Sequence, residues 1–165
     1  MSLMLLIPAI VLIVWMVSMF ALSFTAKMPG GLGVQGGRLA ECPESPNCVC
    51  TQCSSREHWM EPLMYSEDAG IAWSRLKSLI EANSEATIIT ETDGYLHVEF
   101  KTAFFRFVDD VEFLLDAESG RIHFRSASRV GYSDMGLNRR RMEDFRKRFE
   151  SAAVQRSASP VLQNP

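Results

Sequence analysis

The hydrophobic pattern divides the chain into one unbroken apolar run and a longer region in which apolar residues recur at regular intervals. Residues 3–24 read LMLLIPAIVLIVWMVSMFALSF and hold no charged side chain. Roughly 20 apolar residues in a helix are enough to cross a bilayer. A cleaved signal peptide usually has a shorter apolar run, of about 7–15 residues, after a basic stretch, and no Lys or Arg precedes this run. The pattern therefore favours a retained transmembrane anchor over residues 1–26.

A glycine-rich stretch and then a helical period follow the anchor. Residues 27–39 hold five of the ten glycines, so residues 27–41 are predicted to be a flexible or closely turned linker. Ser66-Glu67-Asp68 is typical of a helix cap, and apolar residues recur at helical spacing after it. The buried face of this helix is expected to consist of Trp73, Leu76, Leu79 and Ile80.

From Ala86 the pattern changes to alternation, which predicts strands. ATIITET and YLHVEFK flank Asp93-Gly94, a pair typical of a tight hairpin turn. A second pair of strands, DDVEFLLD and RIHFRSA, is joined by AESG. If Asp116 pairs with Arg121, Glu112 lies opposite Arg125, and the core face is made of Val111, Phe113, Leu115, Ile122, Phe124 and Ser126. A slip of one residue loses this arrangement, so this register is predicted.

The last periodic segment predicts a helix capped by Asn138, with Met142, Phe145 and Phe149 as its buried stripe. The tail from Ser157 is expected to be disordered. This order of elements predicts an α+β class: an N-terminal transmembrane helix and a small two-layer domain, with two helices on one face of an antiparallel sheet. The predicted ranges are 42–150 for the α+β domain and 151–165 for the tail.

Charge narrows the class of protein without indicating an activity. The 165 residues carry a net charge of -3 and have a pI of about 5.6, so the bulk charge does not favour nucleic-acid binding. The membrane is a predicted partner through the N-terminal helix. Lys27 and Arg38 lie after that helix and weakly favour a cytoplasmic domain under the positive-inside tendency. Two charges are too few to fix the orientation of the helix in the membrane.

All four cysteines lie in one short segment, CPESPNCVCTQC, as Cys42, Cys48, Cys50 and Cys53. One or two disulfides are the favoured interpretation for a domain outside the cytoplasm. Reduced thiols are one alternative. A zinc or iron–sulfur site is another, although the single residue between Cys48 and Cys50 does not match the usual spacing of two ligand pairs. We therefore predict neither a metal nor a cofactor.

The segment RSASRVGYSDMGLNRRR holds most of the candidate site residues. It places arginines in the first turn of the predicted last helix, where the helix dipole disfavours cations, so a negative group is expected nearby. An ion-pair network with acids of the neighbouring strand is the favoured interpretation. A site for a phosphate, a carboxylate or a lipid headgroup is the alternative. The candidate binding residues are Asp110, Arg125, Arg129, Asp134, Asn138 and Arg139.

Other chemistry has weaker support. Ser126 or Ser128 with His123 and an aspartate could be imagined as a hydrolytic triad, but no G-x-S-x-G elbow is present. A hard cation could be gathered by the strand acids Asp109, Asp110 and Glu112. A further apolar run consists of Phe104, Phe105 and Phe107. These side chains are expected to pack in the core, and an apolar patch near the bilayer is the alternative.

Two segments resemble a known family. CPESPNCV at residues 42–49, preceded by GRLAE, and FVDDVEFLLD and RSASRVGYSDMGLNRRR within residues 107–141 are similar to a bacterial and plastid domain family catalogued as a domain of unknown function. The resemblance covers most of residues 32–149. It implies a small domain behind a membrane or export segment, outside the cytoplasm, and no particular activity. This chain differs from the family pattern at Cys50 and Cys53, where small residues such as Ser are expected.

Together these features predict a single-pass membrane protein whose domain lies on the extracytoplasmic, periplasmic side of a cell envelope. The leading hypothesis is a binding or interaction module for a small anion, a lipid headgroup or a partner protein. An enzyme that acts on an envelope substrate through the Asp/Arg cluster is the alternative, and a structural subunit of a membrane assembly is a third. A pocket lined by Asp110, Arg125 and Arg129 with shifted protonation states would favour the enzyme.

Overall fold

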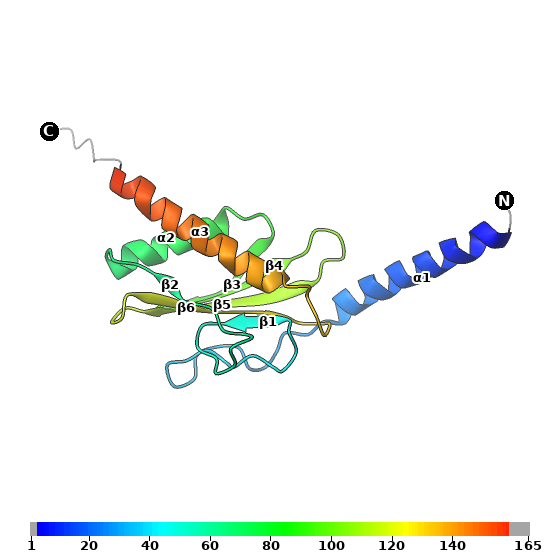
Figure 1. Cartoon of the computed structure of the whole chain (residues 1–165), viewed down its shortest axis with the longest axis horizontal. Helices are drawn as coiled ribbons and strands as arrows, with labels where there is room; N and C mark the ends of the chain where they lie inside the picture. Colours follow the sequence, from blue (N-terminus) through cyan, green and yellow to red (C-terminus); the bar gives the residue numbers. More distant parts are fainter. Residues whose placement is uncertain (1–2, 159–165) are drawn as a thin grey trace.

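The computed structural model describes residues 3–158, which form three helices and six strands (Figure 1). In chain order the elements are α1 (Leu3–Thr25), β1 (Cys48–Cys50), β2 (Leu63–Met64), α2 (Ala69–Glu81), β3 (Ala86–Thr92), β4 (Tyr95–Lys101), β5 (Val108–Asp116), β6 (Arg121–Ser128) and α3 (Leu137–Ala158). Helices α2 and α3 lie together on one side of the sheet, and α1 extends away from the domain.

The helix α1 has the features of a membrane span. Its segment Leu6–Thr25 is 20 residues long, apolar and almost entirely exposed. By length and composition it could cross a bilayer, and a signal sequence near the N-terminus would have the same properties. The structure therefore confirms an N-terminal apolar helix, while its retention and its orientation stay predictions.

The strands form one antiparallel sheet in the order β1-β6-β5-β4-β3, with β2 pairing with β6 as well. The hairpin of β3 and β4 turns at Asp93-Gly94, where Gly94 has a φ of 74°, a left-handed conformation that glycine adopts freely. In the second hairpin Asp116 lies opposite Arg121 and Glu112 opposite Arg125. Both hairpins and the register of the second one are confirmed.

The face of the sheet toward α2 and α3 carries the core. Helix α2 begins as predicted, because Asp68 Oδ1 accepts the N–H groups of Gly70 and Ile71 at 2.9 and 3.2 Å. Fully burying one large apolar side chain stabilises the fold by about 1.5–3 kcal/mol. The core includes, from the helices, Leu76, Ile80, Met142, Phe145 and Phe149, and, from the strands, Leu96, Val98, Phe100, Val111, Phe113, Ile122 and Phe124. The α+β class is confirmed.

The opposite face of the sheet is covered by chain without regular structure. Figure 1 shows the stretch that follows α1 running beneath the sheet, on the side away from the helices. The N–H of Gly33 donates to Glu112 Oε1 at 2.7 Å, and Leu39 is buried. Part of the stretch predicted as a linker, residues 27–41, therefore packs on the sheet. The predicted domain boundaries stay predictions.

Helix α3 begins earlier and ends later than the sequence pattern suggests. It starts at Leu137 and continues to Ala158, so Asn138 lies inside the helix and the prediction that it is the cap is wrong. Asp134 satisfies the free amides instead: its carboxylate accepts the N–H groups of Gly136 and Asn138 at 2.9 and 2.7 Å. Residues 151–158 of the tail predicted to be disordered, Ser157 among them, belong to the helix, so the prediction is wrong for them, and residues 159–165 lie outside the described residues.

The aromatic run of the β4–β5 loop lies outside the core. Phe104 is 64% exposed, and neither Phe105 nor Phe107 belongs to the core cluster. The expectation of core packing is therefore wrong here. Instead, Phe104 and Phe105 pack on aromatic residues of α1.

Candidate functional site

The alternation of β4, β5 and β6 gathers charged side chains on the face of the sheet that is turned away from the helices. Apolar residues at every second position face the core, so the residues between them must point to the other side. Because the stretch that follows α1 and the loop after β1 cover much of this face, these polar side chains are buried rather than solvated. They are His97, Glu99, Asp110, Glu112, Arg125 and Arg129.

Arg129 and Asp110 form the centre of this group. The guanidinium of Arg129 donates through Nε to Asp110 Oδ2 at 2.8 Å and through Nη2 to Asp110 Oδ1 at 2.6 Å. The same nitrogen donates to Glu99 Oε1 at 2.5 Å. His97 Nε2 lies 2.7 Å from Asp110 Oδ1, and Lys101 Nζ lies 2.9 Å from Glu99 Oε2. Asp110 therefore holds this arginine, as the ion-pair interpretation predicts, and Glu99 of the adjacent strand, which that interpretation did not include, holds it as well.

The network keeps its two carboxylates ionised. Burial raises the pKa of Asp110, but the hydrogen bonds from Arg129 and His97 outweigh burial, so the pKa lies below its ordinary value. Burial likewise raises the pKa of Glu99, and the bonds from Lys101 and Arg129 outweigh it, so that pKa is lowered too. Asp110 and Glu99 are therefore fixed anions at neutral pH.

Acid is expected to destabilise the domain through these carboxylates. A carboxyl group whose pKa is lower in the folded state stabilises the fold above the pKa of the unfolded chain, and the stability is lost as the pH falls through the folded value. The melting temperature of the full chain should therefore fall steeply below about pH 4. Thermal unfolding between pH 7 and pH 3 measures this fall, and Glu99→Gln should make it shallower. Equal slopes for both proteins would contradict the assignment to Glu99.

Glu112 occupies the centre of the covered face and is fully buried. Its Oε1 accepts the N–H of Gly33 at 2.7 Å and the hydroxyl of Tyr95 at 2.8 Å. Burial and the neighbouring carboxylate of Glu112 raise the pKa of Tyr95, so this hydroxyl stays protonated and donates. Arg125 Nη1 lies 3.5 Å from Glu112 Oε2, which is a long hydrogen bond.

Arg125 is held much more loosely than Arg129. It is 9% exposed, and its Nε has no hydrogen-bond partner within the described part of the chain. A buried guanidinium donor without an acceptor costs about 1–3 kcal/mol or more. This arginine lines a pocket of about 430 Å³ whose walls also include Asp110, Arg129, Leu32 and Cys42. The sequence reasoning thus identified the three charged residues that meet at this pocket.

Two disulfides join the covering segment to the edge of the sheet. Cys42 is bonded to Cys48 and Cys50 to Cys53, with Cα–Cα distances of 5.7 and 5.8 Å. Cys48 and Cys50 pair with Ala127 and Arg125 of β6, so their side chains share the face of Arg125. The disulfide interpretation is confirmed in the structure. The sulfurs of Cys42, Cys50 and Cys53 lie within 4.8 Å of one another, but all three are used in these bonds.

The other three candidate residues lie elsewhere. Asp134 and Arg139 line a separate small cavity of about 70 Å³ beside Cys48 and His58. Asp134 accepts the amides at the start of α3, and Arg139 donates to the backbone carbonyls of Glu57 and Trp59.

Asn138 is buried at 1% exposure and joins α3 to the sheet. Its Nδ2 donates to Asn47 O and Ser128 Oγ, each at 3.0 Å, and its Oδ1 accepts from Ser126 and Arg141. With both ends of its amide engaged, this side chain acts as a structural tie.

The residues of the alternative hydrolytic triad and of the alternative cation site do not lie together. Ser126 and Ser128 face α3, whereas His123 lies on the other face, with its Nδ1 3.0 Å from Thr51 Oγ1. Asp109 also faces α3 and pairs with Arg141 at 2.6 Å. It is therefore separated by the sheet from Asp110, which is inconsistent with a cation site shared by these strand acids.

Sequence reasoning missed the partners that complete the covered face. Glu99 belongs to the network because it lies opposite Asp110 in the register of β4 and β5, and pairing these two strands in the sequence would have found it. Tyr95 could have been found in the same way, through its alternation with His97. Gly33 contributes only a backbone N–H, for which the sequence carries no signal.

Comparison with known proteins returned a family without an assigned activity. The model of a family described as "Protein of unknown function (DUF1499)" matches residues 38–149. The match includes all four cysteines and the charged residues of the covered face, and α1 lies outside it. No curated protein and no solved structure matches the chain.

Proposed function

The chain belongs to the DUF1499 family of proteins of unknown function, and we propose that it is a membrane-anchored module of the cell envelope that binds a small molecule carrying a phosphate or carboxylate group. The observation that carries the proposal is Arg125, which lines a pocket of about 430 Å³ and whose guanidinium makes one long hydrogen bond, of 3.5 Å to Glu112, within the described part of the chain. A pocket with a few convergent polar groups is the usual form of a small-molecule site.

Arg125 has donors to spare because Glu112 is satisfied by other groups. The two short hydrogen bonds of Glu112 come from Gly33 and Tyr95, and the contact with Arg125 is 3.5 Å long. A guanidinium presents five donors in a planar fork, which matches the oxygens of a carboxylate or a phosphate. An acidic group in the pocket would supply a further acceptor for the guanidinium of Arg125.

The rest of the pocket wall is rigid and electrically balanced. Arg129 is bound to Asp110 and Glu99, so it shapes the wall without being free to move toward a ligand. The negative charges of the network are matched by Arg129 and Lys101. A single acidic group on the ligand therefore fits the site better than a highly charged ligand does.

The pocket supports binding better than catalysis. A general acid or base works best when its pKa lies near the working pH. The pKa of Asp110 is lowered, away from neutrality, and both of its oxygens already accept hydrogen bonds from Arg129. The carboxylate at the pocket is thus engaged in structure, which makes the enzyme hypothesis the weaker one.

The cysteines and α1 support a location in the envelope. Disulfides form and persist in oxidising compartments outside the cytoplasm, and the two bonded pairs follow an apolar helix that could span a membrane. We propose that the domain lies on the extracytoplasmic side. A membrane-impermeant maleimide, applied to intact cells after reduction, should label these cysteines, and labelling only after lysis would contradict this orientation.

Replacing Arg125 is expected to weaken binding on the order of tenfold or more, since a hydrogen bond to a charged group contributes about 1.5–3 kcal/mol. The full chain in nanodiscs of neutral phosphatidylcholine would be titrated with inorganic phosphate and with succinate, by calorimetry. Arg125→Gln should lose affinity for the anion that binds. Titration of nanodiscs that contain phosphatidylglycerol distinguishes a lipid headgroup from a free anion, because a bound headgroup would block the pocket.

Arg121→Gln is the matched control, because Arg121 is an exposed arginine on the same strand and does not line the pocket. It removes the same charge and should leave the affinity unchanged. Thermal unfolding of both variants checks that they fold. Equal affinities of the wild type and Arg125→Gln, with both proteins folded, would show that Arg125 does not bind the anion.

A further inference from the structure

Exposed apolar side chains gather at the end of the domain where α1 is attached. Phe104 in the β4–β5 loop is 64% exposed, and Tyr132 and Met135 in the loop between β6 and α3 are 76% and 86% exposed. The two loops are neighbours, because they line the same cavity. Large apolar side chains held in water are unfavourable, and a contiguous group of them marks an interaction surface.

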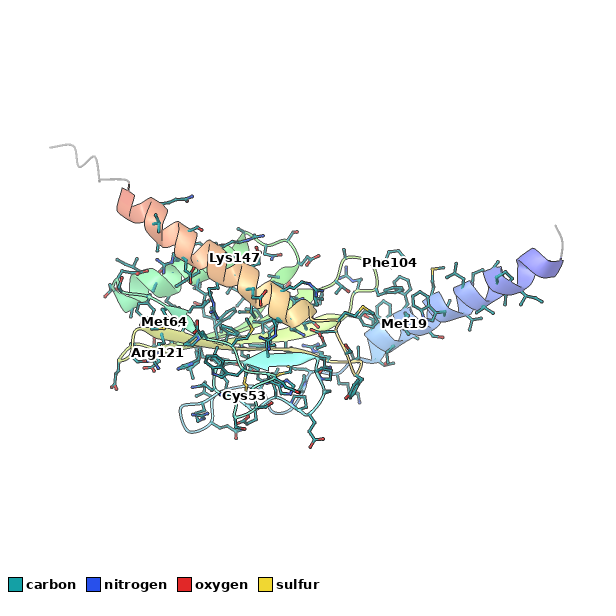
Figure 2. The ribbon with its side chains drawn as sticks, viewed as in Figure 1. Met19, Cys53, Met64, Phe104, Arg121 and Lys147 are labelled. Atoms are coloured by element: carbon teal, nitrogen blue, oxygen red, sulfur yellow. A yellow bond between two sulfur atoms is a disulfide. The ribbon has the colours of Figure 1, made fainter. Side chains whose placement is uncertain are left out.

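This surface is continuous with the apolar surface of α1. Phe105 packs on Trp15 with ring centroids 5.7 Å apart, and Phe20 lies 5.8 Å from Phe104 and 5.4 Å from Phe105. Figure 2 shows Phe104 close to Met19 of α1 and far from Met64 at the other end of the sheet. At 1.5 Å per residue, Phe20 lies about 8 Å from the end of the helix. With α1 in a bilayer, the loop thus reaches the depth of the acyl chains.

The β4–β5 loop is built to hold this position. Thr102 closes the loop, because its backbone N–H donates to Phe107 O at 2.9 Å and its Oγ1 accepts the N–H of Phe107 at 2.9 Å. The N–H of Arg106 donates to Thr102 O at 3.1 Å, and Arg106 has a φ of 58°. The exposed Arg106 adjoins the aromatic residues, and a long basic side chain beside apolar ones suits the interface between headgroups and acyl chains.

An apolar cavity lies between α1 and the two loops. Its volume is about 390 Å³, and Met19 and Leu22 of α1 line it together with Phe107, Val130 and Leu137 of the domain. A space of this size with mostly apolar walls does not favour water, which needs polar partners. Where α1 enters the bilayer, the chemical groups available to fill the space are the acyl chains of lipids.

We propose that the β4–β5 loop and the loop at residues 130–136 form a second membrane contact, which holds the domain against the phospholipid bilayer that contains α1. Phe104, Tyr132 and Met135 insert among the lipids, and an acyl chain occupies the cavity beside Met19. This contact is independent of the pocket at Arg125. The partner is lipid rather than protein because the exposed residues continue the surface of a helix that is itself suited to hydrocarbon.

Photocrosslinking of the full chain in phosphatidylcholine vesicles tests the proposal. The probe is p-benzoylphenylalanine, which replaces Phe104 or Met135 in separate variants, and the matched control carries it in place of Met64. Met64 is exposed to a similar extent, at 55% compared with 64% for Phe104, but lies at the far end of the sheet. Mass spectrometry after irradiation is expected to find a phospholipid adduct at 104 and at 135, and none at 64.

A separate measurement keeps failure of this contact distinct from failure of α1 to insert. Dibrominated phosphatidylcholine should quench the fluorescence of Trp15, and Trp15→Phe should remove that quenching. If Trp15 is quenched while positions 104 and 135 give no lipid adduct, the proposal is wrong. Adducts to a second protein molecule in place of lipid would also overturn it, because the surface would then be a protein interface.

Discussion

Replacing Arg129 with Met is expected to lower the free energy of unfolding by about 3–5 kcal/mol, because it leaves buried carboxylates without their cation. Asp110 is 1% exposed and receives two hydrogen bonds from Arg129, and Glu99 receives a third. His97 and Lys101 remain as partners after the substitution, but neither replaces the two-pronged contact with Asp110. Urea unfolding of the full chain in nanodiscs, followed by tryptophan fluorescence, measures the loss.

Arg148→Met is the matched control for this substitution. Arg148 also forms an ion pair, with Asp144 at 2.8 Å, but both side chains are more than half exposed. An exposed pair of this kind contributes about 0.3–0.5 kcal/mol. The double variant Asp110→Leu/Arg129→Met should recover part of the loss, since it buries no unpaired Asp110. Similar losses for Arg129→Met and Arg148→Met would show that burial of the network has little energetic importance.

Replacing Asn138 with Ala is expected to cost about 2–4 kcal/mol, because its buried partners lose hydrogen bonds at once. The side-chain amide connects α3 to the backbone of Asn47 and to the serines of β6. Alanine is an excellent helix former, so the loss cannot come from helix propensity. The measurement is again urea unfolding of the full chain.

Glu143→Ala serves as the control on the same helix. Glu143 is exposed and lies on α3 five residues further along, so its replacement tests the effect of alanine without loss of a buried amide. A change of less than about 0.5 kcal/mol is expected, as for most surface substitutions. A loss for Asn138→Ala no larger than this would mean that solvent or neighbouring groups replace the amide.

The elements that sequence reasoning found are those whose signal is local. The register of β5 and β6 follows from two coincidences that one shift would destroy: apolar residues on one face, and Glu112 opposite Arg125 on the other. Turn chemistry at Asp93-Gly94 is equally local. Asn138 was predicted as the cap because asparagine is a common helix cap. The residue that accepts the free amides at the start of α3 is Asp134, which lies earlier, in a turn that the sequence does not reveal.

The candidate site could be predicted only in part. Asp110, Arg125 and Arg129 were found because charged residues in a strand that also carries core residues must share its other face. What the sequence did not show is that this face is buried. The cover comes from a glycine-rich stretch that resembles a flexible linker in composition, and its main contact is the backbone N–H of Gly33 with Glu112. A hydrogen bond from a main-chain group does not depend on residue type, so no sequence pattern records it.

The bond between Gly33 and Glu112 also limits how far the domain can stand from the bilayer. Only residues 26–32 separate it from the end of α1, and even fully extended they reach roughly 25 Å. With α1 in a membrane, this short connection keeps the pocket at Arg125 close to the bilayer surface, within a layer not much thicker than the headgroup region and the water next to it. A ligand of the kind proposed for this pocket would therefore have to arrive along the membrane surface or be released there, and a large soluble carrier would find little room to deliver it.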